Sequence, residues 1–202
     1  MTPAEINQLA QAVMDRLFVP IEASGRHVHV TKAQAHALFG HSLTPERPLS
    51  QPGQFLAKER LSIIGPKGEF HNVAVLGPER KEAQIEISLT DGKPLGLTPP
   101  IHLSGQTANT PGAILSGPQG QVRVEQGVMA ARRHIHLSPD EGQRFGVKDK
   151  QVVRLRAMTQ RPVIFEDVVV RIHPNFRAAV HLDYDEANAC GLQKGDFGRI
   201  LP

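Results

Sequence analysis

The sequence has 202 residues, enough for one large domain or two small ones, each with its own hydrophobic core. Apolar residues make up 40% and charged residues 21% of the chain, the net charge is only +3, and no block of Lys or Arg stands out, so no nucleic-acid partner is expected. No stretch approaches the roughly 18 apolar residues that would span a membrane, and no signal-peptide core is present, so we expect no membrane partner. The single cysteine, Cys190, cannot form an intramolecular disulfide. We therefore expect a reduced, cytoplasmic protein.

The first expected element is an amphipathic helix over residues 1–18. Thr2, Pro3 and Glu5 match a helix N-cap, a proline at the first helical position and a capping-box glutamate. The apolar residues that fall on one helical stripe are Ile6, Leu9, Ala10, Val13 and Leu17. This stripe either packs on its own domain or docks elsewhere, and the pattern leaves both open.

Beyond residue 20 the pattern is that of short strands separated by Gly/Pro turns. A Gly-Pro-Lys-Gly turn at 65–68 joins the apolar runs 61–64 and 70–76, which predicts a hairpin. Further strand patterns occupy 84–88, 121–124, 151–156 and 168–172, and brief helical patterns occupy 32–39, 139–145 and 185–189. Such spacing is typical of compact barrels or sandwiches. The segment 98–120, rich in Pro, Gly, Thr and Ser, is the best candidate for a linker.

An internal repeat is visible. Arg-His-Val-His-Val-Thr at 26–31 matches Arg-His-Ile-His-Leu-Ser at 133–138. Each copy runs into a capping box, from Thr31 to Gln34 and from Ser138 to Glu141. The repeat indicates a duplicated strand–helix unit, one in each domain.

The two His-x-His pairs are the strongest candidates for a chemical site. Residues two apart on a strand point to the same face, so His27 lies beside His29, and His134 lies beside His136. Two adjacent imidazoles suit a transition metal, zinc above all. A lone pair is more often an exposed polar face, but two matched copies favour metal binding.

Each pair needs at least one further ligand. His181 lies in a strand pattern at 179–183, whereas Glu86 faces away from the apolar side of its strand, a position that fits either a solvated residue or a ligand. The histidines without a partner at ligand spacing, for which surface or hydrogen-bonded roles are expected, are His36, His41, His71, His102 and His173.

No protein nucleophile is apparent. Cys190 follows a helical pattern with no adjacent base and is expected to be a buried structural thiol, and neither Gly-x-Ser-x-Gly nor a Walker motif is present. Metal ions would therefore supply the chemistry. Lys67 and Arg80 lie in turns, where they are either anion-binding groups or solvated charges.

Together these motifs resemble the PduL-type phosphotransacylases, the phosphate propanoyltransferases of propanediol-utilisation microcompartments. The matching motifs include Arg-His-Val-His at 26–29, Gln-Pro-Gly-Gln at 51–54, Gly-Pro-Lys-Gly at 65–68, Gln-Ile-Glu-Ile-Ser at 84–88, Thr-Pro-Gly at 110–112, Arg-His-Ile-His-Leu-Ser-Pro at 133–139 and His-Leu-Asp at 181–183. The resemblance implies reversible transfer of an acyl group, propanoyl or acetyl, between CoA and phosphate.

The resemblance also implies the site residues. One zinc ion would be held by His27, His29 and Glu86, and a second by His134, His136 and His181. The residues implied to be catalytic are Arg80, which matches the phosphate-binding arginine, together with Glu86 and His134. The residues implied to contact CoA are Ala23, Ser24, Gly25, Lys67 and Asn188.

The chain departs from the family pattern at two positions. Ser24-Gly25 stands where relatives often have Ser-Asn, and Ala74 stands where many have Arg. One expected CoA-binding cation is therefore missing, unless another basic residue replaces it.

The fold implied by the resemblance is mainly β, with two small, internally duplicated barrels, short capping helices and an N-terminal amphipathic helix. The expected divisions are 1–20 for the helix, 21–115 for the first barrel and 116–202 for the second, which the first strand completes by crossing over. The helix resembles an encapsulation peptide, which implies shell or cargo partners in a bacterial microcompartment. The sequence leaves the oligomeric state open, and a homo-oligomer is one of the alternatives.

In the implied mechanism, the first zinc lowers the pKa of the CoA thiol, while Arg80 and the second zinc orient phosphate, without a covalent enzyme intermediate. Two alternatives stay open. One is a zinc-dependent hydrolase of thioesters or phosphoesters, and the other is a non-catalytic barrel in which the metal has only a structural role. The sequence does not decide between acetyl and propanoyl, or between zinc and cobalt or nickel.

Overall fold

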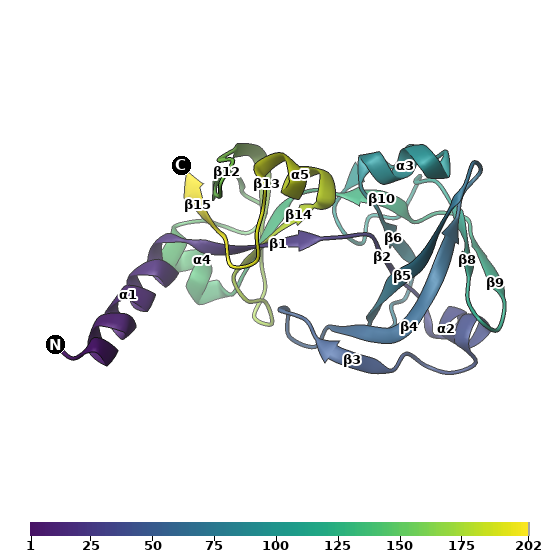
Figure 1. The fold of residues 1–202 in the computed structure, drawn as a ribbon, viewed down its shortest axis with the longest axis horizontal. Helices are drawn as coiled ribbons and strands as arrows, with labels where there is room; N and C mark the ends of the chain where they lie inside the picture. The colour runs from purple at the N-terminus through teal and green to yellow at the C-terminus, as the bar shows by residue number, and fades with distance from the viewer. Residues whose placement is uncertain (202) are drawn as a thin grey trace. The chain divides into compact units, whose positions relative to one another are not determined.

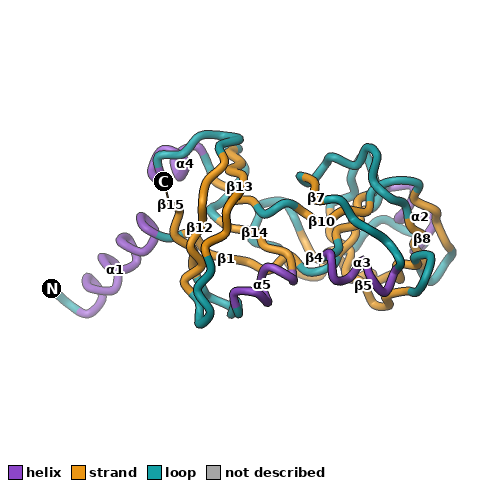
Figure 2. Tube along the Cα trace, turned by 90° about the horizontal axis from the view of Figure 1, so that it is seen from above, coloured by secondary structure: helices purple, strands orange, loops and turns teal. Residues whose placement is uncertain are grey.

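The computed structural model describes residues 1–201 and shows a mainly β protein with five short helices, as predicted (Figures 1 and 2). The helices are α1 (Pro3–Leu17), α2 (Lys32–Phe39), α3 (Leu89–Leu95), α4 (Pro139–Phe145) and α5 (Tyr184–Cys190). The chain forms two compact units. The barrel unit comprises Met1–Ala23, Arg133–Leu182 and the residues from Glu186 on, and the sheet unit comprises Ser24–Arg132 and Asp183–Asp185.

The barrel unit contains a closed six-stranded barrel with the strand order β1-β14-β11-β13-β12-β15. Its strands are β1 (Val19–Ser24), β11 (His134–Leu137), β12 (Val152–Met158), β13 (Ile164–Ile172), β14 (Ala179–Asp183) and β15 (Phe197–Leu201). β1 pairs antiparallel with β15, so the first strand of the chain closes a barrel whose other strands come from its last third. Alternate apolar side chains fill the interior, including Val19, Ile135, Leu155 and Leu182.

The sheet unit contains a nine-stranded sheet with the order β7-β10-β6-β2-β5-β4-β8-β9, and β3 pairs with β4. Its strands are β2 (His27–His29), β3 (Pro45–Pro48), β4 (Phe55–Ile64), β5 (Glu69–Gly77), β6 (Gln84–Glu86), β7 (Ile101–His102), β8 (Ala113–Ser116), β9 (Gln121–Val124) and β10 (Val128–Ala131). The predicted hairpin is present as β4 and β5, and the amide of Gly65 donates to the carbonyl of Gly68 across the turn, at 2.9 Å.

Helix starts follow the local capping chemistry. Complete capping boxes begin α1, α2, α3 and α4, with Thr2, Thr31, Ser88 and Ser138 as the N-caps. The sequence patterns predicted every helix except α3, because Gly92 and Pro94 lie inside it. The Ser88–Asp91 capping box, and Gly96 in the left-handed conformation that ends the helix, are the features that would have identified it.

The segment 98–120, predicted as a linker, is instead built into the sheet unit. It contains β7 and β8, and β8 pairs with β4 and β9. Between these strands Thr107 and Thr110 are buried, and the Thr110 hydroxyl donates to the Thr107 carbonyl at 2.6 Å. The Pro and Gly residues of this segment mark its turns rather than a domain boundary.

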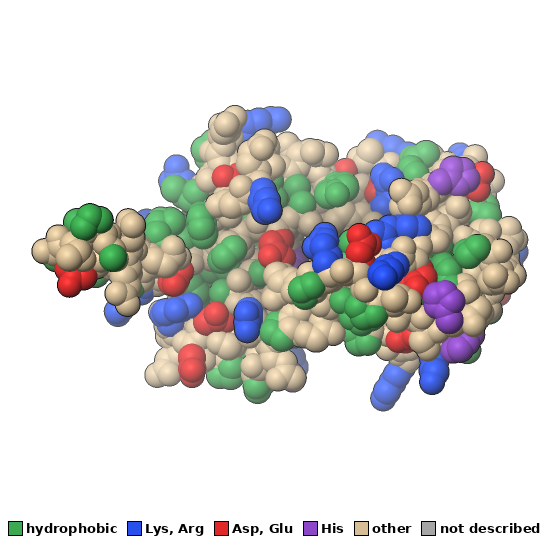
Figure 3. Space-filling view, turned by 60° about the horizontal axis from the view of Figure 1, so that its bottom comes forward, with side chains coloured by type: hydrophobic (Ala, Val, Ile, Leu, Met, Phe, Trp, Pro, Cys, Tyr) green, Lys and Arg blue, Asp and Glu red, His purple; other side chains and the backbone are tan. Residues whose placement is uncertain are grey.

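Helix α1 has no buried residue, and its apolar stripe reaches the surface (Figure 3). Ile6 and Leu9 are 51% and 57% exposed, and Val13 and Leu17 are nearly as open. The stripe therefore does not pack on its own domain. Among residues 1–201, no helix combines the length and apolar character needed to cross a membrane.

Candidate metal centres

The two His-x-His motifs lie on strands with the same surroundings. β2, which carries His27 and His29, has β5 as its parallel neighbour and β6 as its antiparallel neighbour. β11, which carries His134 and His136, has β13 as its parallel neighbour and β14 as its antiparallel neighbour. The sequence repeat is thus a repeat of strand pairing, one copy in each unit.

In the sheet unit, strand register brings together His27, His29 and Glu86, which we call the first ligand group. His27 lies directly opposite Glu86 in the β2–β6 ladder. One ligand atom from each of the three side chains lies within 4.8 Å of the others. All three residues are buried, and Glu86, at 8% exposed, is not the solvated strand residue that its alternation also allowed.

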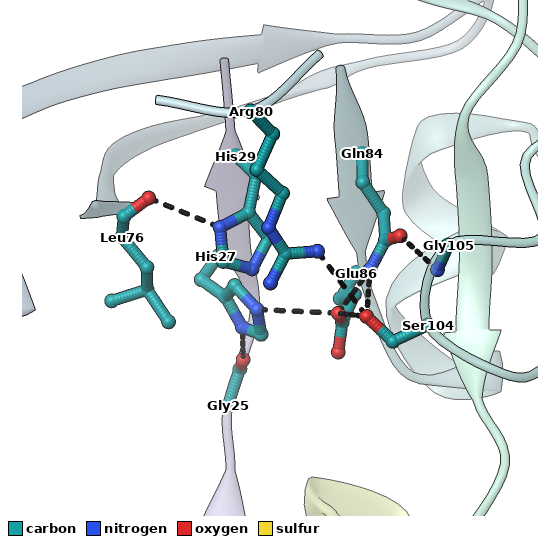
Figure 4. A network of polar contacts seen from close by, with 9 residues as sticks. All are labelled: Gly25, His27, His29, Leu76, Arg80, Gln84, Glu86, Ser104 and Gly105. Atoms are coloured by element: carbon teal, nitrogen blue, oxygen red, sulfur yellow. Dashed lines mark hydrogen bonds and ion pairs between the residues drawn. The ribbon is translucent and has the colours of Figure 1, made fainter. Parts of the chain in front are cut away.

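Hydrogen bonds to backbone carbonyls orient both imidazoles (Figure 4). Nδ1 of His27 donates to the carbonyl of Gly25 at 2.8 Å, and Nδ1 of His29 donates to the carbonyl of Leu76 at 3.0 Å. Because a carbonyl oxygen only accepts, Nδ1 carries the hydrogen in each ring, and Nε2 is the nitrogen that can bind a metal.

Charge and burial shift the pKa of all three side chains. Burial raises the pKa of Glu86, but the charge and hydrogen bond of His27, together with the charge of Arg80, outweigh it and hold that pKa well below its ordinary value. Burial, reinforced by the charges of His27 and Arg80, lowers the pKa of His29 well below its ordinary value, so this imidazole is neutral near pH 7. Burial also opposes protonation of His27, but the Glu86 carboxylate raises the pKa of His27 overall.

The distances suit a tetrahedral ion. Nε2 of His27 lies 3.5 Å from Oε1 of Glu86, and two ligand atoms on one tetrahedral zinc are about 3.3 Å apart. Two imidazoles and one carboxylate are a three-ligand set that leaves a coordination position for a substrate. The residues therefore fit a catalytic metal ion.

The second ligand group, in the barrel unit, consists of His134, His136 and His181. His134 lies opposite His181 in the β11–β14 ladder, so the third ligand occupies the place that Glu86 has in the first group. The ring centroids are 4.7–5.1 Å apart, and the ligand atoms lie within 4.8 Å of one another. Phe176 packs on His136, with 4.1 Å between ring centroids. Three imidazoles fit zinc.

Arg80 lies beside the first ligand group. Its backbone amide donates to the carbonyl of Val30 at 2.9 Å, and its guanidinium donates to the hydroxyl of Ser104 at 3.2 Å (Figure 4). A pocket of about 260 Å³ is lined by Pro52, Gly53, Gln54, Gly77, Pro78 and Arg80. Arg80 therefore contributes both to this pocket and to the electrostatics of the metal ligands.

The other residues implied to bind CoA lie outside the two ligand groups. Ser24 ends β1, Lys67 is exposed in the β4–β5 turn, and Asn188 is exposed on α5. Ala23 is also exposed. Gly25 is half-buried, and the outer atoms of the Tyr184 ring occupy the space that a Cβ would take, so a side chain at this position requires the exposed Tyr184 ring to move.

Ala74, the second departure, lies on β5 between two polar neighbours. It is paired with His27 on one side and with Arg60 on the other. The Arg60 guanidinium donates to the Glu46 carboxylate at 2.8 Å. A cation therefore exists next to position 74, on the adjacent strand.

The repeat has a further regularity, in the arginine that precedes each His pair. Arg26, before the first His pair, binds Asp91 at 2.7 Å, and Arg133, before the second, binds Glu186 at 2.5 Å. Each of these carboxylates stands five positions after the third ligand of its own unit. This shared spacing is a signal in the sequence that marks Glu86 and His181 as equivalent positions of the repeat, without reference to any family.

The remaining histidines were expected to have surface or hydrogen-bonded roles, and Cys190 was expected to be a buried thiol. The other five histidines belong to neither ligand group. His71 contacts the hydroxyl of Ser62, and Nδ1 of His102 contacts the carbonyl of Gln106. Cys190 is buried, and its thiol donates to the carbonyl of Ala187.

Comparison with known proteins places this arrangement in one family. The family model described as phosphate propanoyltransferase matches residues 20–193. Proteins named phosphate propanoyltransferase from Clostridioides difficile and Enterococcus faecalis are each 46% identical, over 97% of this chain and 97% of their own length. One from Thermotoga maritima is 43% identical over 98% of this chain and 95% of its own.

Proposed function

This chain belongs to the phosphate propanoyltransferase family, and from that membership we propose that it converts an acyl-CoA and phosphate into an acyl phosphate and CoA, reversibly. Propanoyl-CoA is the proposed main substrate, with acetyl-CoA as a second. The observation that carries the proposal is the first ligand group: three buried, oriented donor residues next to a guanidinium.

We propose zinc as the metal of both ligand groups. The donor sets, two imidazoles with a carboxylate and three imidazoles, support this choice. When bound, zinc supplies Lewis acidity that stabilises the CoA thiolate and the negative charge of phosphate and of the acyl oxygen.

The chain's own residues bind and orient the reactants. The Arg80 guanidinium binds phosphate, and its bond to Ser104 limits the directions in which it can point. The backbone carbonyls of Gly25 and Leu76 hold the two imidazoles in place. In the second ligand group, His134 is the residue we propose to be catalytic.

The reaction proceeds without a covalent enzyme intermediate. The only cysteine is buried, its thiol donates to a backbone carbonyl, and burial raises its pKa. A thiol in that state is a poor nucleophile. A phosphate oxygen therefore forms the new bond to the acyl carbon, and the bond from that carbon to the CoA sulfur breaks.

For CoA, the proposed contacts are Ala23, Ser24, Gly25, Lys67 and Asn188. The exposed ammonium of Lys67 suits the phosphates of the nucleotide part of CoA. At position 74, where a cation is absent, Arg60 on the neighbouring strand is the proposed replacement.

Residues 1–20 are proposed to dock on a shell or cargo protein of a bacterial microcompartment. The support is the exposed apolar stripe of α1, which no other part of the described chain covers. A helix with one apolar face is suited to bind in an apolar groove of a partner.

Release of the free CoA thiol from propanoyl-CoA tests the proposed reaction. We expect release that requires phosphate, yields one acyl phosphate for each thiol, and stops when a chelator removes the metal. Release that proceeds without phosphate would identify a hydrolase instead. If no CoA is released and the protein unfolds when a chelator removes the metal, the chain is a non-catalytic barrel with a structural metal site.

A further inference from the structure

The first ligand group has a fourth corner. In the β2–β6 ladder, Glu86 lies opposite His27 and Gln84 lies opposite His29, so four side chains form a square on one face of the sheet. Gln84 is 1% exposed, and sequence analysis gave it no role. It is the only corner of the square whose side chain is not a metal-ligand candidate.

Gln84 is fixed in one orientation (Figure 4). Its Oε1 accepts a hydrogen bond from the amide of Gly105 at 2.7 Å, and because an amide N–H only donates, the side chain cannot be flipped. Nε2 therefore points to Glu86, where it donates to Oε1, and to the Ser104 hydroxyl at 2.9 Å. The group that faces Glu86 is therefore an NH2 donor, which does not bind a metal, so Gln84 supports Glu86 instead of joining the ligand set.

Ser104 connects this support to Arg80. Its hydroxyl oxygen accepts from Gln84 and, at 3.2 Å, from the Arg80 guanidinium. Its proton points to Oε1 of Glu86, 3.5 Å away. A hydroxyl group has one proton and two lone pairs, so these three contacts use all of its hydrogen-bonding capacity.

The amide at the fourth corner distinguishes the first group from the second. In the second group, the position opposite His136 is occupied by Ala179, which has no polar side chain. A histidine third ligand is a ring that strand packing can hold, whereas a carboxylate rotates about its terminal bond and needs a directed donor to fix it.

We propose that Gln84 and Ser104 are positioning residues: Gln84 holds the Glu86 carboxylate for the metal, and Ser104 holds the Arg80 guanidinium for phosphate. The inference rests on the proposed function and deepens it. It predicts separate effects, because loss of Gln84 acts first on metal affinity, and loss of Ser104 acts first on phosphate binding.

The role of Gln84 is tested by zinc binding to the protein after a chelator has removed its metal. The zinc affinity is measured by competition with a chelator of known affinity. Gln84→Met keeps the side-chain volume and removes the hydrogen bonds. It should weaken the binding of one of two zinc ions about 10–100-fold and leave the other unchanged. Two zinc ions bound with unaltered affinity would overturn the role of Gln84.

Steady-state kinetics with zinc in excess test Ser104. Ser104→Ala should raise the KM for phosphate about 10-fold, because a hydrogen bond to a charged group is lost, with a smaller change in kcat and in zinc affinity. An unchanged KM for phosphate would overturn the role of Ser104. This half-buried loop residue also keeps the proposal testable if Gln84→Met does not fold.

Thr107→Val is the matched control. Thr107 lies in the same loop, is buried, and donates to the Glu82 carboxylate at 2.6 Å, but Glu82 is not in a ligand group. The control should lose stability while keeping zinc affinity and the KM for phosphate. Equal losses in the control would show a merely structural effect and overturn the proposal. If the unmodified chain binds no zinc, the proposed function itself fails, and this inference with it.

Discussion

At the scale of single residues, the first ligand group combines a buried carboxylate, Glu86, with the positive charges of His27 and Arg80. The Glu86 carboxylate faces His27 and lies near Arg80, and its pKa stays well below the ordinary value because these cations outweigh the effect of burial. Removing the negative charge would take from His27 the carboxylate that raises its pKa. A buried charge that loses its partner is costly, so the stability of the group depends on Glu86.

Replacement of Glu86 tests this balance. Glu86→Gln keeps the size of the side chain and removes its charge, so we expect transfer to fall to background and the affinity for one zinc ion to drop, while the chain stays folded. Glu82→Gln, in the segment just before β6, is the control and should retain both properties. Wild-type turnover in Glu86→Gln would contradict the assignment.

A second residue-scale prediction concerns pH. The amide of Thr90 donates to the Asp185 carboxylate at 2.9 Å, and the pKa of Asp185 is lowered because the hydrogen bonds from Thr90 and Ser88 outweigh partial burial. A depressed carboxyl pKa contributes stability above its unfolded-state value and loses it as the pH falls through the folded-state value.

Asp185→Asn should therefore lower the free energy of unfolding at pH 7 by about 1 kcal/mol. In denaturant titrations at a series of pH values, the difference from the unmodified chain should shrink toward acid pH. A difference that is constant down to pH 2 would show that the charge of Asp185 has no part in stability.

At the scale of elements, local patterns account for the strands that carry the histidines but not for their third ligands. Alternation in the two His-x-His motifs correctly placed both imidazoles of each pair on one face of a strand. Glu86 and His181 reach those faces only through pairing with β6 and β14, strands far along the chain. Strand alternation does not reveal such pairing: it left Glu86 open as a solvated residue or a ligand, and the family resemblance decided between the two.

Helix caps give an element-scale test. Ser138 caps α4, which directly follows the ligand strand β11, so Ser138→Ala should destabilise the chain by about 1 kcal/mol in denaturant titrations. Thr2 caps α1 in the same way, but α1 has no buried residue. Thr2→Ala should therefore leave the unfolding midpoint unchanged, and a loss equal to that of Ser138→Ala would mean that α1 contributes to the stability of the barrel unit.

At the scale of the whole molecule, the sequence predicted a mainly β fold with duplication, and the structure agrees. The linker prediction for 98–120 failed because Pro and Gly also mark turns between strands, and this segment contains β7 and β8. The role of β1 was not apparent from local patterns either, since a strand of six residues reveals nothing of the partner it will pair with, and β15 lies at the opposite end of the chain.

Two truncations separate the roles of α1 and β1. Deletion of residues 1–17 removes the exposed helix and leaves β1, so we expect unchanged zinc binding, turnover and unfolding midpoint, with loss only of co-localisation with a microcompartment. Deletion of residues 1–24 also removes β1 and opens the barrel, so it should unfold the barrel unit. Equal stability of the two truncations would contradict the part assigned to β1.

The most direct test of the account is the return of activity when zinc is added back to the chelated protein, followed as phosphate-dependent release of CoA from propanoyl-CoA. The account predicts no release before zinc is added and full activity at two zinc ions per chain, with Glu86→Gln and His134→Ala inactive at any zinc concentration. Full phosphate-dependent release from the metal-free chain would contradict it.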